Sequence, residues 1–298
     1  MPYLGEIAAL LTSLVWSAAS TMFTLGGRQV GSVILNRVRL AMTVFFLIIA
    51  HWILLGQPLP LDAGPDRWLW LGLSGFIGLV VGDAFLFQAF LWIGPRLSLL
   101  MMSLAPVIAA LIAWLFLGET LTPVQVFGIL LTISGVAWVI LERNGDKNNK
   151  NHNYTRGIIF GLISAIGQAL GLVLAKNGMS GDFSPISGNF IRMATAAVVM
   201  WGLAAFQGQV GVTLRRLTAN RRAALILLAG SFTGPFVGVS LSLLAIQHAP
   251  VGIASTLMSL SPVFLLPIGY VVFKERFGWQ AILGTLVTVI GVAVIFLV

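Results

Sequence analysis

The sequence predicts an all-α integral membrane protein in which ten transmembrane helices form two inverted five-helix repeats. Hydrophobic residues make up 58% of the 298 residues and charged residues only 9%, whereas soluble domains carry roughly a quarter of charged residues. The chain also consists of two halves that repeat one another. Because five helices are an odd number, the second half must enter the bilayer from the side opposite to the first.

The repeat is clearest in two stretches, 98–141 and 254–297, which align at one constant offset. Their shared residues include Met102 and Met258, Pro106 and Pro262, Glu119 and Glu275, Gly128 and Gly284, and Gly135 and Gly291. Two unrelated apolar segments would share Leu and Val, but they would not also keep a proline, an acid and two glycines in register. We therefore divide the chain into a first repeat of residues 1–141, a polar linker of 142–155 and a second repeat of 156–298.

Each repeat contains five apolar spans of about 20 residues, the length that a helix needs to cross a hydrocarbon core of about 30 Å. The expected limits are 5–25, 32–55, 68–92, 95–117 and 122–141, then 156–176, 185–206, 222–247, 251–273 and 279–298. Glycine and proline mark the breaks between spans, for example at Gly26-Gly27, Gly94-Pro95 and Gly118. Only the linker is polar over any length, so no soluble domain is expected.

Basic residues are distributed unevenly between the loops. All but Arg67, Lys176 and Arg192 of the 17 lysines and arginines lie at or near the loops that follow the odd-numbered spans. The positive-inside rule then places the linker in the cytoplasm and both termini outside. The net charge of +8 is spread over short loops instead of one solvated face, which argues against nucleic-acid binding. The chain has no cysteine, which excludes disulfides and thiolate chemistry.

The first repeat resembles the EamA family of the drug/metabolite transporter superfamily at the stretch from Met102 to Pro106, at Gly118-Glu119-Thr120-Leu121-Thr122 and at the glycines that follow. The second repeat matches too. The resemblance covers nearly the whole chain. It implies a ten-helix, multi-pass carrier of the cell (inner or plasma) membrane, usually an exporter of amino acids or related metabolites. It also implies a cavity lined mainly by helices 1, 3, 4, 6, 8 and 9. Members often have both termini in the cytoplasm, which is opposite to what the charge distribution of this chain indicates.

The last span of each repeat, with Gly128 and Gly135 or Gly284 and Gly291, is similar to the packing motif in the final helix of the small multidrug-resistance transporters. Those proteins couple drug export to protons through a mid-membrane glutamate in their first helix. Here the acid of the first span is Glu6, at its very end. Proton-driven export of cationic drugs by that mechanism is therefore disfavoured.

Polar side chains follow one face of the first span and recur in the sixth. The stripe consists of Ser13, Ser17, Ser20 and Thr24, matched by Ser164, Gln168, Gly171 and Ala175. Small and hydroxylic residues commonly mark contacts between membrane helices. The alternative is a polar wall on each side of a cavity, where Trp16, Ser17, Ser20 and Gln168 bind substrate. The sequence leaves both interpretations open.

Glycine pairs, prolines and methionines add further candidates. The pairs Gly78/Gly82 and Gly234/Gly238 permit close helix packing, and equally they leave volume for a ligand. Pro106 and Pro262 fall inside the fourth and ninth expected helices, where each predicts a kink and a candidate gate hinge. The candidate substrate contacts beside them are Met101, Met102, Met258 and Ser259, although methionine serves equally well as core filler.

Charged residues inside the spans are strong functional candidates, because an unpaired charge in a membrane costs several kcal/mol. We predict that Asp83 is a substrate-site residue; the alternative is an ion pair with Arg37 or Arg39. We also predict two cross-repeat gate pairs, one at each mouth. They are Arg39 with Glu275 and Arg192 with Glu119. The alternative is that the glutamates cap their loops and the arginines bind lipid phosphate.

Together these features predict a secondary transporter of small amino-acid-like metabolites that works by alternating access, as a monomer and without a cofactor or metal. Trp16 and the nearby methionines favour aromatic or large apolar substrates. Lipophilic drug-like or nucleotide-related compounds are the alternative class. An intramembrane enzyme would need an acid–base or metal cluster and an ion channel a ring of like charges, and the sequence shows neither.

Overall fold

The computed structural model describes residues 3–116, 122–144, 153–249, 254, 257–274 and 278–297, and every regular element among them is a helix. The first half contains α1 (Leu4–Val30), α2 (Ser32–Leu55), α3 (Pro65–Ser74), η1 (Gly75–Gly82), α4 (Asp83–Met102), α5 (Ala105–Phe116) and α6 (Pro123–Asn144). The second half contains α7 (Tyr154–Gly178), α8 (Pro185–Phe206), α9 (Val210–Ala219), α10 (Arg221–Ser231), η2 (Phe232–Gly238), α11 (Val239–His248), α13 (Ser261–Phe273) and α14 (Trp279–Leu297). η1 and η2 are π-helices.

Seven of the described helical stretches are long and apolar enough to cross a membrane. They are Leu4–Val30, Ser32–Leu55, Pro65–Met102, Pro123–Leu141, Tyr154–Gly178, Pro185–Phe206 and Arg221–Ala245. Two further apolar helices, Ser261–Phe273 and Trp279–Ile295, are shorter. The chain is therefore a multi-pass membrane protein, but the expected total of ten transmembrane helices is not confirmed. One reason is that the expected third and fourth spans run together between Pro65 and Met102.

Glycines with positive φ set the breaks between several helices. Gly31 (φ 91°) separates α1 from α2, and Gly56 (φ 74°) ends α2. Gly94 (φ 83°) bends α4 immediately before Pro95, where the sequence predicts a break. Residues with a Cβ rarely adopt this backbone region, so glycine is needed at these turns. In contrast, α1 continues through Gly26-Gly27, which face the side chains of Leu227 and Leu35.

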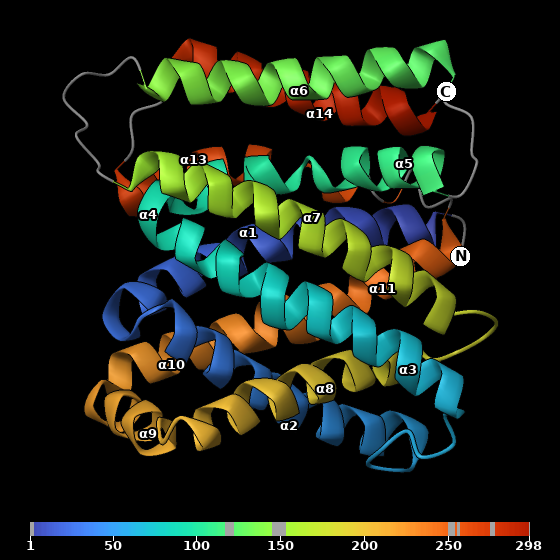
Figure 1. The fold of residues 1–298 in the computed structure, drawn as a ribbon, viewed down its shortest axis with the longest axis vertical. Helices are drawn as coiled ribbons and strands as arrows, with labels where there is room; N and C mark the ends of the chain where they lie inside the picture. The colour runs from blue at the N-terminus through green and yellow to red at the C-terminus, as the bar shows by residue number, and fades with distance from the viewer. Residues whose placement is uncertain are drawn as a thin grey trace.

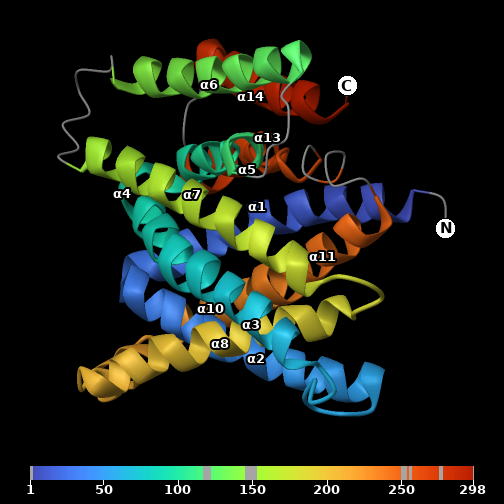
Figure 2. The ribbon, with the colours of Figure 1, turned by 45° about the vertical axis from the view of Figure 1, so that its right-hand side comes forward.

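The two halves are interleaved by an exchange of their first helices. α1 packs against α10, η2 and α11 of the second half, whereas α7 packs against α3, η1 and α4 of the first. α1 and α7 run in opposite directions in Figure 1, and α2 lies against α8 (Figure 2). The largest apolar cluster among the described residues includes Leu47 of α2, Leu71 of α3 and Ile191 of α8, so it joins helices of both halves. Opposite directions of equivalent helices are what inverted repeats require.

α6 and α14 form a pair at one end of the molecule (Figures 1 and 2). A Cβ on Gly135 would lie 2.6 Å from the backbone nitrogen of Thr288, and one on Gly128 would lie 2.9 Å from the carbonyl oxygen of Gly291. The glycines therefore let the two backbones touch. This is the arrangement implied by the similarity to the final helix of small multidrug-resistance transporters.

The sequence did not predict α9, a ten-residue helix that follows α8 and precedes α10. It mixes apolar residues with two arginines and two threonines, and it is too short to give a membrane signal. Asn220 ends this segment and caps α10, because its side chain accepts a hydrogen bond from the backbone nitrogen of Ala223 at 3.0 Å.

Candidate functional site

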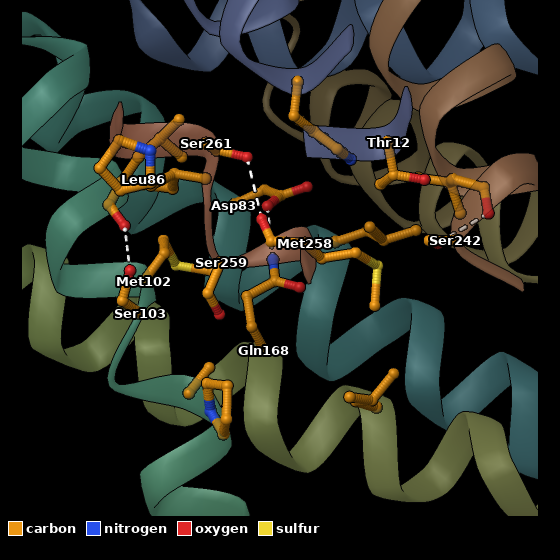
Figure 3. A pocket seen from close by; sticks show the side chains of 18 of the residues that line it. Thr12, Asp83, Leu86, Met102, Ser103, Gln168, Ser242, Met258, Ser259 and Ser261 are labelled. Carbon is orange, nitrogen blue, oxygen red and sulfur yellow. Dashed lines mark hydrogen bonds between the residues drawn. The ribbon is translucent and has the colours of Figure 1, made fainter. Parts of the chain in front are cut away.

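A cavity of about 240 Å³ lies where the two halves meet (Figure 3). Its wall comes from α1, η1, α4 and α5 of the first half and from α7, α8, α11 and the start of α13 of the second. The lining is mostly apolar, with a few polar side chains that include Asp83, Gln168 and Arg192. Secondary transporters built from inverted repeats bind their solutes in such a place.

Six of the predicted substrate-site residues line this cavity. They are Trp16, Asp83, Met102, Gln168, Met258 and Ser259. Three residues predicted to act in gating also line it, namely Pro106, Arg192 and Pro262. The sequence therefore identified much of the cavity wall, while the division of these residues into binding and gating roles stays a prediction.

Ser17, Ser20 and Met101 lie outside the cavity lining. The Ser17 hydroxyl donates to the carbonyl oxygens of Ser13 at 2.7 Å and Ser261 at 2.9 Å, so it joins α1 to the start of α13. The Ser20 hydroxyl donates to the carbonyl oxygen of Ser17 at 3.0 Å, and Met101 is buried over a glycine of α7. For these residues the structure shows the helix-packing alternative.

Four polar residues of the described cavity wall were not among the site residues predicted from the sequence: Thr12, Ser103, Ser242 and Ser261. Thr12 precedes Trp16 by four residues, so it lies on the same face of α1, and this spacing could have revealed it. Ser242 is one of the two serines of α11, and no pattern in the sequence distinguishes it. Ser261 donates its hydroxyl to the carbonyl oxygen of Ser13 at 3.1 Å.

The expectation that Pro106 and Pro262 kink continuous helices is wrong. Turns at Ser103-Leu104 and Ser259-Leu260 interrupt the chain, and each proline is the second residue of a new helix, α5 or α13. Proline is favoured there, because the first backbone amides of a helix have no partner within it. The first turns of both helices line the cavity.

Arg39 and Asp83 form an ion pair, the alternative considered for Asp83 from the sequence. Arg39 is 0% exposed, and its Nε donates to Oδ1 of Asn36 at 3.0 Å. Its guanidinium carbon lies 4.8 Å from the centroid of the Phe87 ring. Nε2 of Gln168 donates to the other carboxylate oxygen of Asp83 at 2.6 Å (Figure 3). Each oxygen of the buried carboxylate therefore has a donor.

The π-helices supply backbone acceptors for this network. A π-helix changes the pairing of backbone amides and carbonyls, and π-helical turns are frequent at functional sites. In η1, the carbonyl oxygen of Gly78 accepts from Gln168 at 3.1 Å and that of Leu79 accepts from Asn36 at 3.2 Å. In η2, the carbonyl oxygen of Pro235 accepts from Asn189 at 2.9 Å. The two asparagines thus bind equivalent carbonyls in the two repeats.

Arg192 is the repeat equivalent of Arg39, but its surroundings differ. Arg192 is 7% exposed and lines the cavity. Within the described residues its Nε is buried without an acceptor, and Oδ1 of Asn189 is buried without a donor. The charge of Arg192 acts on Asp83, yet among the described residues the ion pair of Asp83 is with Arg39 alone.

The predicted gate pairs involve residues that the structure does not describe. Glu119 and Glu275 lie outside the described residues, so the pairs of Arg39 with Glu275 and of Arg192 with Glu119 stay predictions. Arg37, the other arginine considered as a partner of Asp83, donates to the hydroxyl of Thr213 at 3.3 Å instead.

Glycines bring α7 into close contact with η1 beside the cavity. A Cβ on Gly167 would lie 2.9 Å from Cα of Gly82, and one on Gly171 would lie 3.1 Å from Cα of Gly78. At the equivalent contact of the other repeat, a Cβ on Gly238 would lie 3.3 Å from the indole ring of Trp16. Glycine therefore allows backbone packing in one repeat and makes room for the Trp16 side chain in the other.

Comparisons with known proteins agree with this arrangement. The model of the EamA-like transporter family matches residues 3–141 and 155–297. A WAT1-related chloroplastic protein of Arabidopsis thaliana is 22% identical over 248 residues, which are 83% of this chain and 58% of that protein. A solved crystal structure aligns with a TM-score of 0.62 and 16% identity over 98% of this chain and 96% of the other. At that identity the likeness concerns the fold alone.

Proposed function

We propose that this chain, which belongs to the EamA-like transporter family and is thus a membrane transporter of small solutes, carries amino acids or similar metabolites by alternating access. The observation that supports this best is the cavity at the contact of the two halves. A solute held there contacts helices of both repeats, so movement of one repeat against the other would expose it first to one side and then to the other.

The size of the cavity favours small metabolites over drug-like compounds. Its volume of about 240 Å³ lies below the range of about 300–1,000 Å³ that is usual for pockets of drug-sized ligands. Trp16, Leu86 and Met102 offer an apolar surface for an aromatic or large aliphatic side chain. The hydroxyls of Thr12 and Ser242 donate to the carbonyl oxygens of Ala8 and Val239, and their oxygens can accept hydrogen bonds from its polar end.

We further propose that transport is outward across the cell membrane and that one chain suffices. A monomer is the simplest functional unit, since the fused repeats already surround the cavity from both sides. A transporter of this family needs no catalytic group, and the described residues contain no cluster of three or more side chains suited to a metal ion.

Counterflow in proteoliposomes tests the proposal. Vesicles loaded with unlabelled phenylalanine or leucine should transiently accumulate the labelled amino acid from outside, because only a carrier exchanges one molecule for another. Empty vesicles are the control. Absence of exchange for every amino acid tested would contradict the proposal, and inhibition by tetraphenylphosphonium or by a nucleoside, followed by exchange of that compound, would favour the alternative substrates.

A further inference from the structure

We propose that Arg192 binds the carboxylate of the transported solute and that the solute needs no amino group. The inference rests on the proposed transport function and gives its solutes a chemical class, namely small monocarboxylates with an apolar body. Zwitterionic amino acids belong to this class through their carboxylate, whereas the corresponding amines do not. Four observations on the described residues support this assignment.

The first observation is the unused hydrogen-bonding capacity of Arg192. Its guanidinium carries five N–H donors, yet in the described part of the chain Nε has no acceptor although it is buried. A buried charge without partners is costly in a membrane protein, so intramembrane charges of this kind usually serve a pathway or a ligand. The planar guanidinium fits a carboxylate with two parallel hydrogen bonds.

The second observation is the balance of charge around the cavity. Arg39 and Arg192 carry two positive charges, and within the described part of the chain Asp83 is the one acid that lines the cavity. One positive charge is therefore uncompensated among these buried groups. A guest with a single negative charge makes the group neutral, whereas a zwitterion leaves the sum unchanged and a cationic amine makes it worse.

The third observation concerns Asp83, which would be the obvious partner of an ammonium group. One carboxylate oxygen binds Arg39 and the other accepts from Gln168 at 2.6 Å. An ammonium would have to displace one of these donors. It would otherwise find only uncharged acceptors along the described cavity wall, such as the amide oxygen of Gln168 and the hydroxyls of Thr12 and Ser242. The cavity is therefore better suited to an anion than to a cation.

The fourth observation is that two helices begin at the cavity. The first turns of α5 and α13 line it, and both helices are longer than ten residues. A helix N-terminus carries partial positive charge, and broken helices of transporters commonly direct such ends toward anionic groups of their substrates. These termini and Arg192 belong to the same cavity wall, so they favour the same guest charge.

Sets of three compounds that share a side chain, namely an acid, an amino acid and an amine, test the inference on the purified full-length protein in detergent. The aromatic set is 3-phenylpropionate, phenylalanine and phenethylamine. A second, aliphatic set is 4-methylpentanoate, leucine and isopentylamine. We expect the acid of at least one set to bind and to raise the unfolding temperature, its amino acid to bind no more tightly than the acid, and its amine to have no effect at equal concentration.

Variants of the arginine identify the binding group. Arg192→Gln should weaken binding of the acid at least tenfold, and Arg192→Lys should retain part of it, because lysine keeps the charge but loses the paired donors. Lys176→Gln is the matched control, since it removes an exposed cation of α7 and should leave affinity unchanged. A size-exclusion profile and unfolding temperature like those of the unaltered protein establish that Arg192→Gln is folded.

The outcomes separate this inference from the transport function. Binding of both acids that survives in Arg192→Gln, amines that bind as tightly as the acids, or a failure of both acids to bind would each overturn it. Loss of acid binding in Arg192→Gln together with no counterflow by the unaltered protein would support the carboxylate site and contradict transport. Amino-acid counterflow that is unchanged in Arg192→Gln would support transport and contradict the carboxylate site.

Discussion

The Asn36–Arg39 segment of α2 and the Asn189–Arg192 segment of α8 occupy equivalent positions in the two repeats. Both asparagines bind a carbonyl of the neighbouring π-helix. Arg39 is then fixed by Asn36 and Asp83, although its Nη1 has no partner among the described residues. Arg192 forms no ion pair within the described residues, where its Nε and Oδ1 of Asn189 are also unpaired. The difference arises because the repeat equivalent of Asp83 is Val239. A single acid thus gives one arginine a structural role and leaves the other available to a solute.

The largest expected effect comes from removing that acid. Asp83→Leu leaves Arg39, which is 0% exposed, as a buried charge without its partner, and it should lower the free energy of unfolding by about 3–5 kcal/mol. The double variant Arg39→Met/Asp83→Leu removes both charges and should recover most of this loss. Unfolding in mixed detergent micelles measures the free energy of unfolding of both variants. Equal stability of Asp83→Leu and the unaltered protein would show that the ion pair has no structural role.

The two asparagines offer a matched comparison between the repeats. Asn36→Ala deprives both the Leu79 carbonyl and Arg39 of a partner, so stability should fall by about 1–3 kcal/mol for each buried group left unpaired. Asn189→Ala removes an oxygen that is already buried without a donor, which offsets part of its loss. The same unfolding assay should therefore show a smaller effect for Asn189→Ala, and the reverse order would contradict the proposed asymmetry.

A smaller effect is expected where α7 touches η1. Gly171→Ala places a Cβ 3.1 Å from Cα of Gly78, and because the neighbour is backbone we expect a loss of about 1–3 kcal/mol from overpacking. Gly202→Ala is the control within α8, since a Cβ there meets no atom within 4 Å, and it should gain about 0.5–1 kcal/mol from helix propensity. Similar thermal stability of the two variants would argue against close packing at this contact.

The membrane class, the two-repeat organisation and much of the cavity wall could be predicted from the sequence. Composition and span length predict the membrane class, and the constant offset between the halves predicts the two-repeat organisation. Trp16, Asp83 and Gln168 could be identified as cavity residues because charged, amide and large aromatic groups are unusual inside apolar spans. The chain breaks before Pro106 and Pro262 could not, since a proline within a long apolar run is compatible with both a kink and a new helix.

The distinction between Arg39 and Arg192 also escaped the sequence. Both arginines follow an asparagine by three residues and lie at similar distances from the starts of their helices. Which of them reaches Asp83 depends on how the repeats pack, and on the π-helix that positions this acid. Ser17 and Ser20 illustrate the same limit, because hydroxyl groups on a helix face bond to backbone carbonyls as readily as they line a cavity.

The most direct test of the central claim compares Arg39→Gln with Arg192→Gln in two parallel measurements, unfolding stability and affinity for 3-phenylpropionate or 4-methylpentanoate, whichever binds the unaltered protein more tightly. Arg39→Gln leaves the buried carboxylate of Asp83 without its ion-pair partner, so we expect it to lose about 3–5 kcal/mol of stability. We expect Arg192→Gln to keep its stability and to lose at least tenfold in affinity for the acid. Equal losses of stability in the two variants, or acid binding that persists in Arg192→Gln, would contradict a structural role for Arg39 and a binding role for Arg192.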